Sequence, residues 1–159
     1  NKTNSNLFIT GKAGSGKSTL LEYFRQNTKK NYAILAFQGI AALKAKGQTI
    51  HSFFKFPPHF ISEDDVDTLK DKETIQKLDT ILIDEISMVR ADLFDAIDIS
   101  LKKNRNNNQP FGGVQIVLFG DVMQIDCLLL QGSPEPLDKV VVHIAPSPPH
   151  SDCDIDLRQ

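Results

Sequence analysis

The sequence predicts an α/β fold in which a parallel β-sheet is flanked by helices. Three observations predict this fold class. Short, continuously apolar runs recur along the chain, as expected for strands that are covered on both faces. Apolar residues at helical spacing follow several of these runs, and strands that alternate with helices indicate a parallel sheet. Two runs end in polar pairs, at 84–85 and 120–121, and the carboxyl ends of parallel strands form the usual ligand-binding edge.

Size and composition indicate one soluble globular domain. The chain has 159 residues, of which 40% are hydrophobic and 24% are charged. No apolar run approaches the roughly 18 residues that span a membrane, so we expect no membrane partner. The net charge is −2, which excludes attraction of the whole surface to nucleic acid. Any contact with DNA must therefore be local.

The first elements are a strand, a glycine loop and a helix. Leu7–Thr10 is apolar and ends at Gly11, and the spacing of the apolar residues after Ser18 predicts a helix. Tyr32–Phe37 predicts a second strand, and a second helix is expected to open at Gly39. Residues 56–78 contain two adjacent prolines and an acidic stretch but no strand pattern. We expect them to form a small insertion.

The later elements repeat this alternation. Thr80–Ile83 and Val114–Phe119 predict buried strands, and apolar residues every four positions from 93 to 101 predict a helix between them. The polar tract 102–108 is expected to end that helix as a solvated loop. Five of the eight prolines lie beyond residue 125, which leaves 139–145 as the one convincing strand there. We therefore expect a nucleotide-binding domain over 1–124 and a divergent tail of the same domain over 125–159.

Residues 11–18 satisfy the pattern G-x-x-x-x-G-K-[ST] between a predicted strand and a predicted helix. Glycines let the backbone turn its N–H groups inward as a nest for phosphate oxygens. Lys17 would place a charge on the β and γ phosphates of ATP, and Ser18 would offer a hard oxygen to Mg²⁺. A glycine-rich turn with an exposed lysine is the alternative. The expected nucleotide-binding residues are Gly11, Gly14, Ser15, Gly16, Lys17, Ser18 and Thr19.

Polar residues after two strands complete the predicted catalytic set. Asp84 is expected to bind Mg²⁺ opposite Ser18, and Glu85 to polarise the attacking water as general base. Gln124 is expected to hydrogen-bond the γ phosphate and sense its loss. The alternatives are a solvated acidic pair and an ordinary loop glutamine. The predicted catalytic residues are therefore Lys17, Glu85 and Gln124.

Two cysteines, Cys127 and Cys153, are too few for a disulfide framework, and they lack zinc-ligand spacing. We expect free thiols in a reducing compartment.

Five motifs together indicate a family. They occupy residues 11–19, 39–42 (Gly-Ile-Ala-Ala), 47–54 (Gly-Gln-Thr-Ile-His-Ser-Phe-Phe), 84–88 (Asp-Glu-Ile-Ser-Met) and 111–115 leading to 120–124. On these motifs, residues 7–124 resemble the PIF family of ATP-dependent DNA helicases, relatives of RecD in the 5′-to-3′ branch of superfamily one. The third and fourth motifs are much more specific than a nucleotide-binding loop alone.

The resemblance implies a RecA-like P-loop motor domain that binds ATP and Mg²⁺ at one edge and single-stranded DNA across the top. Gly39, Thr49, His51 and Ser52 match positions that look like DNA-facing residues in the family. It also implies a second motor domain that this chain lacks, and work in DNA repair, recombination and telomere maintenance. The location implied is intracellular: a bacterial cytoplasm, or the nucleus or mitochondrion of a eukaryote.

Some alternatives stay open at this point. Phe53, Phe54 and Phe56, interleaved with lysines from Lys44 to Lys55, either stack on bases or belong to the core. The family usually has a Pro-Thr pair where this chain has Phe37-Gln38. A different P-loop enzyme, such as a small-molecule kinase, and a nucleotide-binding module without turnover are the alternative functions.

Overall fold

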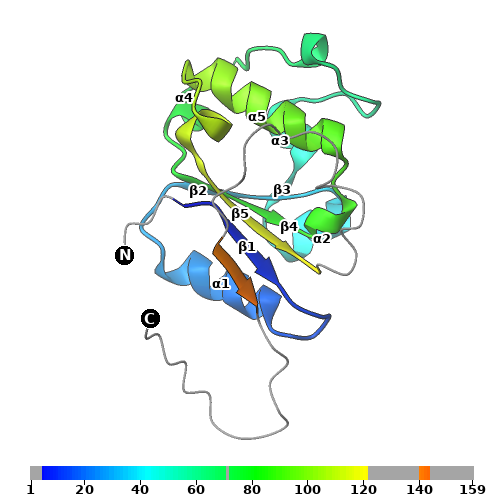
Figure 1. Ribbon diagram of the computed structural model, residues 1–159, viewed down its shortest axis with the longest axis vertical. Coiled ribbons are helices and arrows are strands. Elements are labelled where there is room, and N and C mark those ends of the chain that lie inside the picture. The colour runs from blue at the N-terminus through cyan, green and yellow to red at the C-terminus, as the bar shows by residue number, and fades with distance from the viewer. Residues whose placement is uncertain (1–4, 71, 122–139, 144–159) are drawn as a thin grey trace, which may run out of the picture.

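A computed structural model of the chain describes residues 5–70 and 72–121 and the backbone of 140–143, and its centre is a six-stranded sheet (Figure 1). The strands are Leu7–Thr10 (β1), Tyr32–Ala36 (β2), Gln48–Thr49 (β3), Thr80–Asp84 (β4), Gln115–Gly120 (β5) and Val140–His143 (β6). Their order is β3-β2-β4-β5-β1-β6, and every pairing between neighbours is parallel. The predicted fold class is confirmed. β6 falls within the strand predicted for 139–145.

The continuous apolar runs arise because the central strands are covered on both faces. In β4, Ile81 and Ile83 pack into one hydrophobic cluster and Leu82 packs into the other. In β5 the same alternation sends Ile116 to the first cluster and Val117 to the second. Because successive side chains of a strand point to opposite faces, both sets of positions must be apolar.

Helices lie on opposite sides of this sheet. The helix α1 (Lys17–Asn27) packs Leu21 into the cluster that holds Leu82, whereas α5 (Ala91–Arg105) packs Leu93 and Ile97 into the cluster that holds Ile83. Figure 1 shows these two helices on opposite sides of the strands. The short helices α3 (Ile50–Phe54) and α4 (Lys72–Gln76) join the α5 side, and α2 (Gly39–Lys44) contacts β2 and β3 at the sheet edge.

The prediction that residues 102–108 form a solvated loop is wrong for the first half of the tract. The helix α5 continues to Arg105 and ends at Asn106, whose φ is 50°. Asn104 is buried, and its side-chain oxygen accepts a hydrogen bond of 2.8 Å from the amide of Leu69. Arg105 donates to four backbone carbonyls, those of Ile75, Gln76, Leu78 and Gly112. These polar side chains hold the neighbouring backbone to α5 and are not simply solvated.

Residues 56–70 and 72–79 contain no strand, and they cover the α5 side of the core. They contribute five buried apolar side chains: Phe56, Ile61, Val66, Ile75 and Leu78. Two short 3₁₀ helices, Ile86–Met88 and Pro110–Gly113, flank α5, and a third, Glu63–Asp65, lies within this segment. The segment therefore holds part of the core although it adds nothing to the sheet.

Burial shows whether Phe53, Phe54 and Phe56 could stack on bases or belong to the core. Phe54 is 2% exposed and Phe56 is 7% exposed, and their rings stack with centroids 5.2 Å apart. These two rings belong to the core and are not available to stack on bases. Phe53 is partly buried and packs against the same cluster.

In the described part of the chain, no helix combines the length and apolar character needed to cross a membrane.

Candidate nucleotide site and nucleic-acid edge

The glycine loop leaves the sheet from an inner strand. β1 lies between β5 and β6, and Thr10 is in register with Gly120 on one side and His143 on the other. The amide of Gly11 donates a 3.4 Å hydrogen bond to the carbonyl of Gly120. The loop therefore emerges at the carboxyl edge of the sheet, where ligands of parallel sheets bind.

Two positions in the loop require glycine because of their backbone conformation. Gly14 has φ 80° and Gly16 has φ 92°, a left-handed region that other residues rarely adopt. A Cβ at either position would meet no atom within 4 Å, so space is not the constraint. Gly16 precedes α1, whose first turn has no side-chain cap. The uncapped amides and the positive end of the helix dipole suit an anion.

Lys17 and Ser15 both present polar atoms at this loop. The ammonium of Lys17 donates hydrogen bonds to the carbonyl of Gly11 and, at 3.0 Å, to that of Lys12. Ser15 is 8% exposed, and in the described part of the chain its hydroxyl is the one buried side-chain N or O atom without a hydrogen-bond partner. A buried hydroxyl normally has a partner, and a phosphate oxygen would supply one.

Asp84 and Glu85 lie at the end of β4, as the sequence predicts. β5 separates β4 from β1, and the amide of Glu85 donates a 3.0 Å hydrogen bond to Oδ1 of Asp84. Burial raises the pKa of Asp84; the charge of Glu85 adds to the rise, and the Glu85 amide and the Lys17 ammonium oppose it. The side chain of Glu85 is exposed, and its backbone adopts the left-handed conformation, with φ 52°. The P-loop lysine and the acidic pair thus share one edge.

These residues fit a magnesium–nucleotide complex. The side chains of Ser18 and Thr19 are exposed at the start of α1. Magnesium binds through one or two protein oxygens and completes its shell with phosphate oxygens and water. Ser18 and Asp84 carry such oxygens, and among the described residues no group of three or more His, Cys, Asp or Glu side chains could hold a metal ion. Gln124 lies outside the described residues, as do Cys127 and Cys153, so the role of Gln124 stays a prediction.

The four residues expected to face DNA lie at the other end of the same edge. Gly39 begins α2, Thr49 ends β3, and His51 and Ser52 lie in the first turn of α3. Thr49 is in register with Ala36 of β2, which is in register with Asp84. The structure therefore brings these residues to the carboxyl ends of β2 and β3, beyond the acidic pair.

Two of these four side chains have partners within the fold. Oγ1 of Thr49 accepts a 3.2 Å hydrogen bond from the amide of Ser52 and so caps α3. His51 packs edge-on against Phe37, with centroids 5.8 Å apart. Burial lowers the pKa of His51, and the charge of Arg90 lowers it further. The sequence did not predict that Phe37 and Arg90 lie near His51, because both are distant from it along the chain and no motif links them.

The PIF1-like helicase family matches residues 1–154. The Saccharomyces cerevisiae protein named ATP-dependent DNA helicase PIF1 is 37% identical over 133 residues, which is 76% of this chain and 15% of the yeast protein. The Psychrobacter sp. ATP-dependent DNA helicase Pif1 is 39% identical over 132 residues, which is 78% of this chain and 20% of that protein. The chain thus spans a fifth or less of the length of these two relatives.

Solved structures agree in fold. The Bacteroides Pif1 helicase in complex with ADP-AlF3 and single-stranded DNA is 42% identical, with a TM-score of 0.71, over 76% of this chain and 29% of that one. The Candida albicans Pif1 helicase is 29% identical, with a TM-score of 0.73, over 89% of this chain and 36% of that one.

Proposed function

The chain belongs to the PIF1-like helicase family, and on that premise we propose that it is the first motor domain of an ATP-dependent DNA helicase. It binds ATP and Mg²⁺ at the carboxyl edge of the sheet and couples hydrolysis to the unwinding of DNA. The observation that supports this most is the shared edge: β1, which leads into the glycine loop and Lys17, and β4, which ends at Asp84, are both parallel neighbours of β5, so the loop and the acidic pair lie at the carboxyl ends of nearby strands.

Nucleotide binding is proposed for the loop and the first turn of α1. The amides of the loop and the hydroxyl of Ser15 bind phosphate oxygens, and Lys17 exchanges its bonds with the loop carbonyls for bonds with the β and γ phosphates. Ser18 and Asp84 would hold Mg²⁺, which would neutralise charge on the phosphates. This assignment is supported by the relative that was solved with ADP-AlF3.

Glu85 is the proposed general base for hydrolysis. Its left-handed backbone, with φ 52°, turns the chain away from the line of β4, and its side chain is exposed beside the half-buried Asp84. Two adjacent carboxylates in different surroundings can divide the work: the buried one binds the cation, and the solvated one accepts a proton from water. Gln124 is proposed to contact the γ phosphate.

Single-stranded DNA is the proposed polymer ligand, and its contacts are assigned to Gly39, Thr49, His51 and Ser52. These residues are contiguous with the nucleotide edge, and the relative solved with ADP-AlF3 also holds single-stranded DNA. Because Thr49 already caps α3, its contact with DNA would use the remaining lone pair or the backbone. Repair, recombination and telomere maintenance, in an intracellular compartment, are the proposed settings.

The isolated chain is proposed to bind ATP better than it hydrolyses it. Each arginine of the described part is engaged elsewhere: Arg25 with Glu22, Arg90 with Asp92, and Arg105 with backbone carbonyls. An arginine that neutralises the transferring phosphoryl group contributes on the order of 10³ to 10⁵ in rate in related enzymes. We assign that contribution to a second motor domain. Binding without turnover is therefore the second candidate function for this chain alone.

The deciding experiment measures ATP hydrolysis by the chain with and without single-stranded DNA, and uses Lys17→Ala as the control. Stimulation by DNA, lost in Lys17→Ala, would support the motor. Nucleotide binding without turnover would support the second candidate. Phosphate transfer to a small metabolite, with no effect of DNA, would contradict both and favour a kinase.

A further inference from the structure

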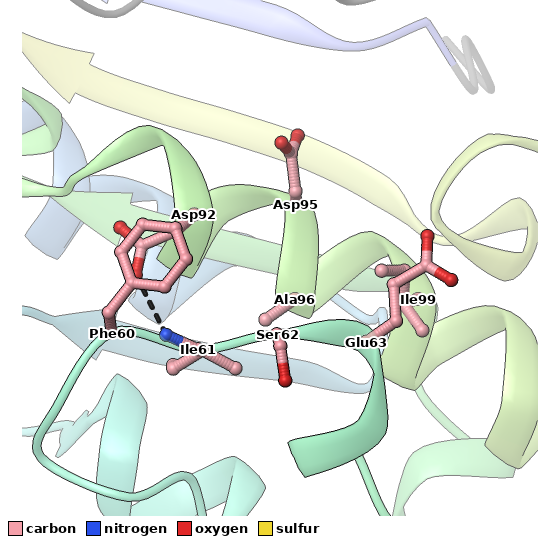
Figure 2. Close-up of a pocket in the computed structure, with 8 residues that line it drawn as sticks. All are labelled: Phe60, Ile61, Ser62, Glu63, Asp92, Asp95, Ala96 and Ile99. Atoms are coloured by element: carbon pink, nitrogen blue, oxygen red, sulfur yellow. Dashed lines mark hydrogen bonds between the residues drawn. The ribbon is translucent and has the colours of Figure 1, made fainter.

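One groove of the described surface lies between residues 60–63 and α5, and its volume is about 260 Å³. Figure 2 shows Phe60 and Glu63 at opposite ends of this groove, and Asp95 pointing away from the segment. The carboxylate of Asp92 already forms an ion pair. The polar groups of this groove therefore do not converge on one ligand.

A larger groove, with a volume of about 450 Å³, follows the outer edge of β2, where Tyr32, Ala33, Ile34 and Leu35 line it. All five residues of β2 pair with β4, but β3 pairs only with Leu35 and Ala36. Within the described part of the chain, Tyr32, Ala33 and Ile34 therefore have no neighbouring strand on the outer side. An uncovered strand edge presents backbone N–H and C=O groups that can pair with another extended segment.

The turn before β3 forms one end of this groove. The chain reaches β3 from α2 through Lys46, whose backbone is left-handed with φ 53°, and through Gly47. Gly47 packs directly on β2, since a Cβ there would lie 2.2 Å from the backbone oxygen of Ile34. The turn thus covers the edge of β2 as far as Ile34 and leaves the edge at Tyr32 open.

Alternate backbone groups of β2 face this groove. The carbonyl of Asn31 accepts a 3.2 Å hydrogen bond from the amide of Thr80, so it points toward β4. Because the direction of the backbone groups alternates along a strand, those of Tyr32 and Ile34 point to the outer edge. Within the described residues, no turn or side chain forms a hydrogen bond with the backbone of Tyr32. The open edge therefore offers backbone groups with which a further strand can pair.

The two walls of the groove differ in character. On the α1 side it is lined by Arg25 and Lys46, which share the carboxylate of Glu22 at 3.2 and 3.9 Å. Two cations against one carboxylate leave this wall with an excess of positive charge. On the opposite side the groove is lined by Phe53 and Leu78, which pack in the hydrophobic cluster on the α5 side. One wall therefore suits carboxylates and the other suits apolar side chains.

We propose that this groove binds an extended segment of a partner protein, in which acidic and apolar residues alternate, as an added strand on β2. The backbone of the segment pairs with Tyr32 and Ile34. Because successive side chains of a strand point to opposite faces, the acidic ones meet the cationic wall and the apolar ones lie on Phe53 and Leu78. This docking site lies along the strand edge and not at the carboxyl ends of the strands, so it goes beyond the proposed motor function and does not depend on it.

The first test uses the whole chain and a fluorescein-labelled peptide whose core, Glu-Val-Glu-Val-Glu-Val, is flanked by Gly-Ser. Binding is measured by anisotropy, and amide hydrogen exchange locates the site. We expect the peptide to slow exchange at Tyr32 and Ile34, but not at Ala33 and Leu35, whose amides face β4. Two further peptides carry N-methyl groups on the three glutamate amides or on the three valine amides. Only one of these sets of amides can face β2, so one peptide should lose binding and the other should keep it.

The second test replaces a lysine on each side of the groove. Lys46→Gln should weaken binding of the alternating peptide by about two- to fivefold, the range for exposed ion pairs. The matched control is Lys77→Gln, because Lys77 is exposed, is likewise paired with one glutamate, and lies on the apolar side of the groove. It should leave binding unchanged. The melting temperatures of both variants should equal that of the unsubstituted chain, since both lysine side chains are exposed.

Several outcomes would overturn the proposal. Equal binding of the two methylated peptides would exclude pairing with the strand edge, and equal effects of the two lysine variants would exclude the cationic wall. Protection of Tyr32 and Ile34 by single-stranded DNA would assign the groove to nucleic acid, and protection that grows with protein concentration would assign it to a second copy. Residues 152–157 of the chain also alternate between aspartate and apolar residues. If replacing their three aspartates with asparagine speeds exchange at Tyr32 and Ile34, that segment is the occupant instead of a partner.

Discussion

The ammonium of Lys17 donates a hydrogen bond to the carbonyl oxygen of Gly11, at the opposite end of the same glycine loop. A second bond reaches the carbonyl of Lys12. The lysine therefore binds the loop that is proposed to hold the phosphates. Phosphate oxygens carry more charge than carbonyls and would displace both bonds.

The first prediction concerns this exchange. Lys17→Met removes the ammonium and keeps most of the side-chain length. The affinity for ATP should fall at least about tenfold, since a charge-assisted hydrogen bond contributes about 1.5 to 3 kcal/mol. The free energy of unfolding without nucleotide should change by only about 1 kcal/mol. Titration with a fluorescent ATP analogue and urea denaturation check the two parts. An unchanged affinity would remove Lys17 from the binding site.

The second prediction concerns pH and Asp84. Burial raises the pKa of this carboxyl, so in the folded protein it ionises at higher pH than in the unfolded chain. As pH rises from about 4, the usual value for aspartate, through the raised pKa, the folded protein loses stability relative to the unfolded chain. Asp84→Asn should therefore be more stable than the unsubstituted chain at neutral pH, and the difference should vanish at about pH 4 and below.

The same substitution should remove the effect of Mg²⁺ on ATP binding, because the amide carries no charge. Urea midpoints across this pH range, and ATP titrations with and without EDTA, are the measurements. A variant that is less stable at neutral pH would contradict the direction of the shift. The conservative control is Asp79→Asn, at an exposed carboxylate that precedes β4.

The third prediction separates binding from chemistry. Glu85→Gln keeps the size of an exposed side chain but cannot accept a proton. The single-turnover rate of ATP hydrolysis with DNA present should fall by about 10²- to 10⁴-fold, the usual contribution of a general base. The dissociation constant for ATP should stay within about twofold, since Glu85 is not assigned to binding. Equal losses in rate and in affinity would mean that Glu85 binds the nucleotide instead.

The fourth prediction compares two glycines of the same region. A Cβ on Gly47 would lie 2.2 Å from the backbone oxygen of Ile34, so β2 would have to move. Gly47→Ala should lower the free energy of unfolding by about 1 to 3 kcal/mol. A Cβ on Gly39 would meet no atom within 4 Å, and Gly39→Ala should change stability by less than about 0.5 kcal/mol. Guanidinium unfolding curves of both variants give the values, and similar losses at the two sites would contradict this steric argument.

Gly39→Ala then serves as a folded variant for the DNA edge. If Gly39 approaches the DNA backbone, the Gly39→Ala variant should bind single-stranded DNA more weakly than the unsubstituted chain, and its unfolding curve should be unchanged. Equal affinity would remove Gly39 from the proposed contacts.

The fifth prediction concerns the buried amide of Asn104. Its side chain accepts from the amide of Leu69 and donates to the carbonyl of Ser100. Asn104→Ala leaves the Leu69 amide without its acceptor and should cost about 1 to 3 kcal/mol of unfolding free energy. Asn108→Ala, in an exposed part of the same polar tract, is the matched control and should be neutral. If the two variants unfold at the same urea concentration, the buried hydrogen bonds contribute nothing to stability.

The position and conformation of the glycine loop in the candidate site could be predicted from the sequence, because they depend on residues that are adjacent along the chain. The loop needs glycine at positions 14 and 16 because the backbone there is left-handed, and Lys17 follows directly in the chain. Both left-handed glycines lie within the loop that the sequence predicts. The strands were found for a similar reason: burial on both faces leaves a continuous apolar run. The short strand β3 was not found, because two residues show no period and exist as a strand only through their pairing with β2.

Other features depend on contacts between distant residues. The polar tract after Leu101 looked solvated, yet Asn104 is buried because the segment around Leu69 packs over it. Phe54 and Phe56 lie among lysines in the sequence, and only the packing of α3 against the α5 side shows that they are core. No spacing rule predicted that Phe60 and Asp95 would line one groove.

By itself, the sequence determined the fold class, the glycine loop and the position of the acidic pair at 84–85. The apolar runs of strands covered on both faces, the torsion angles of the loop and the acidic residues that follow β4 are each recorded in residues that are close along the chain. The tertiary structure decided the strand order, which brings the charge of Lys17 to bear on Asp84, and it decided which polar side chains are buried. The strand order and the burial of polar side chains depend on how distant segments pack together, and no local sequence pattern determines that packing.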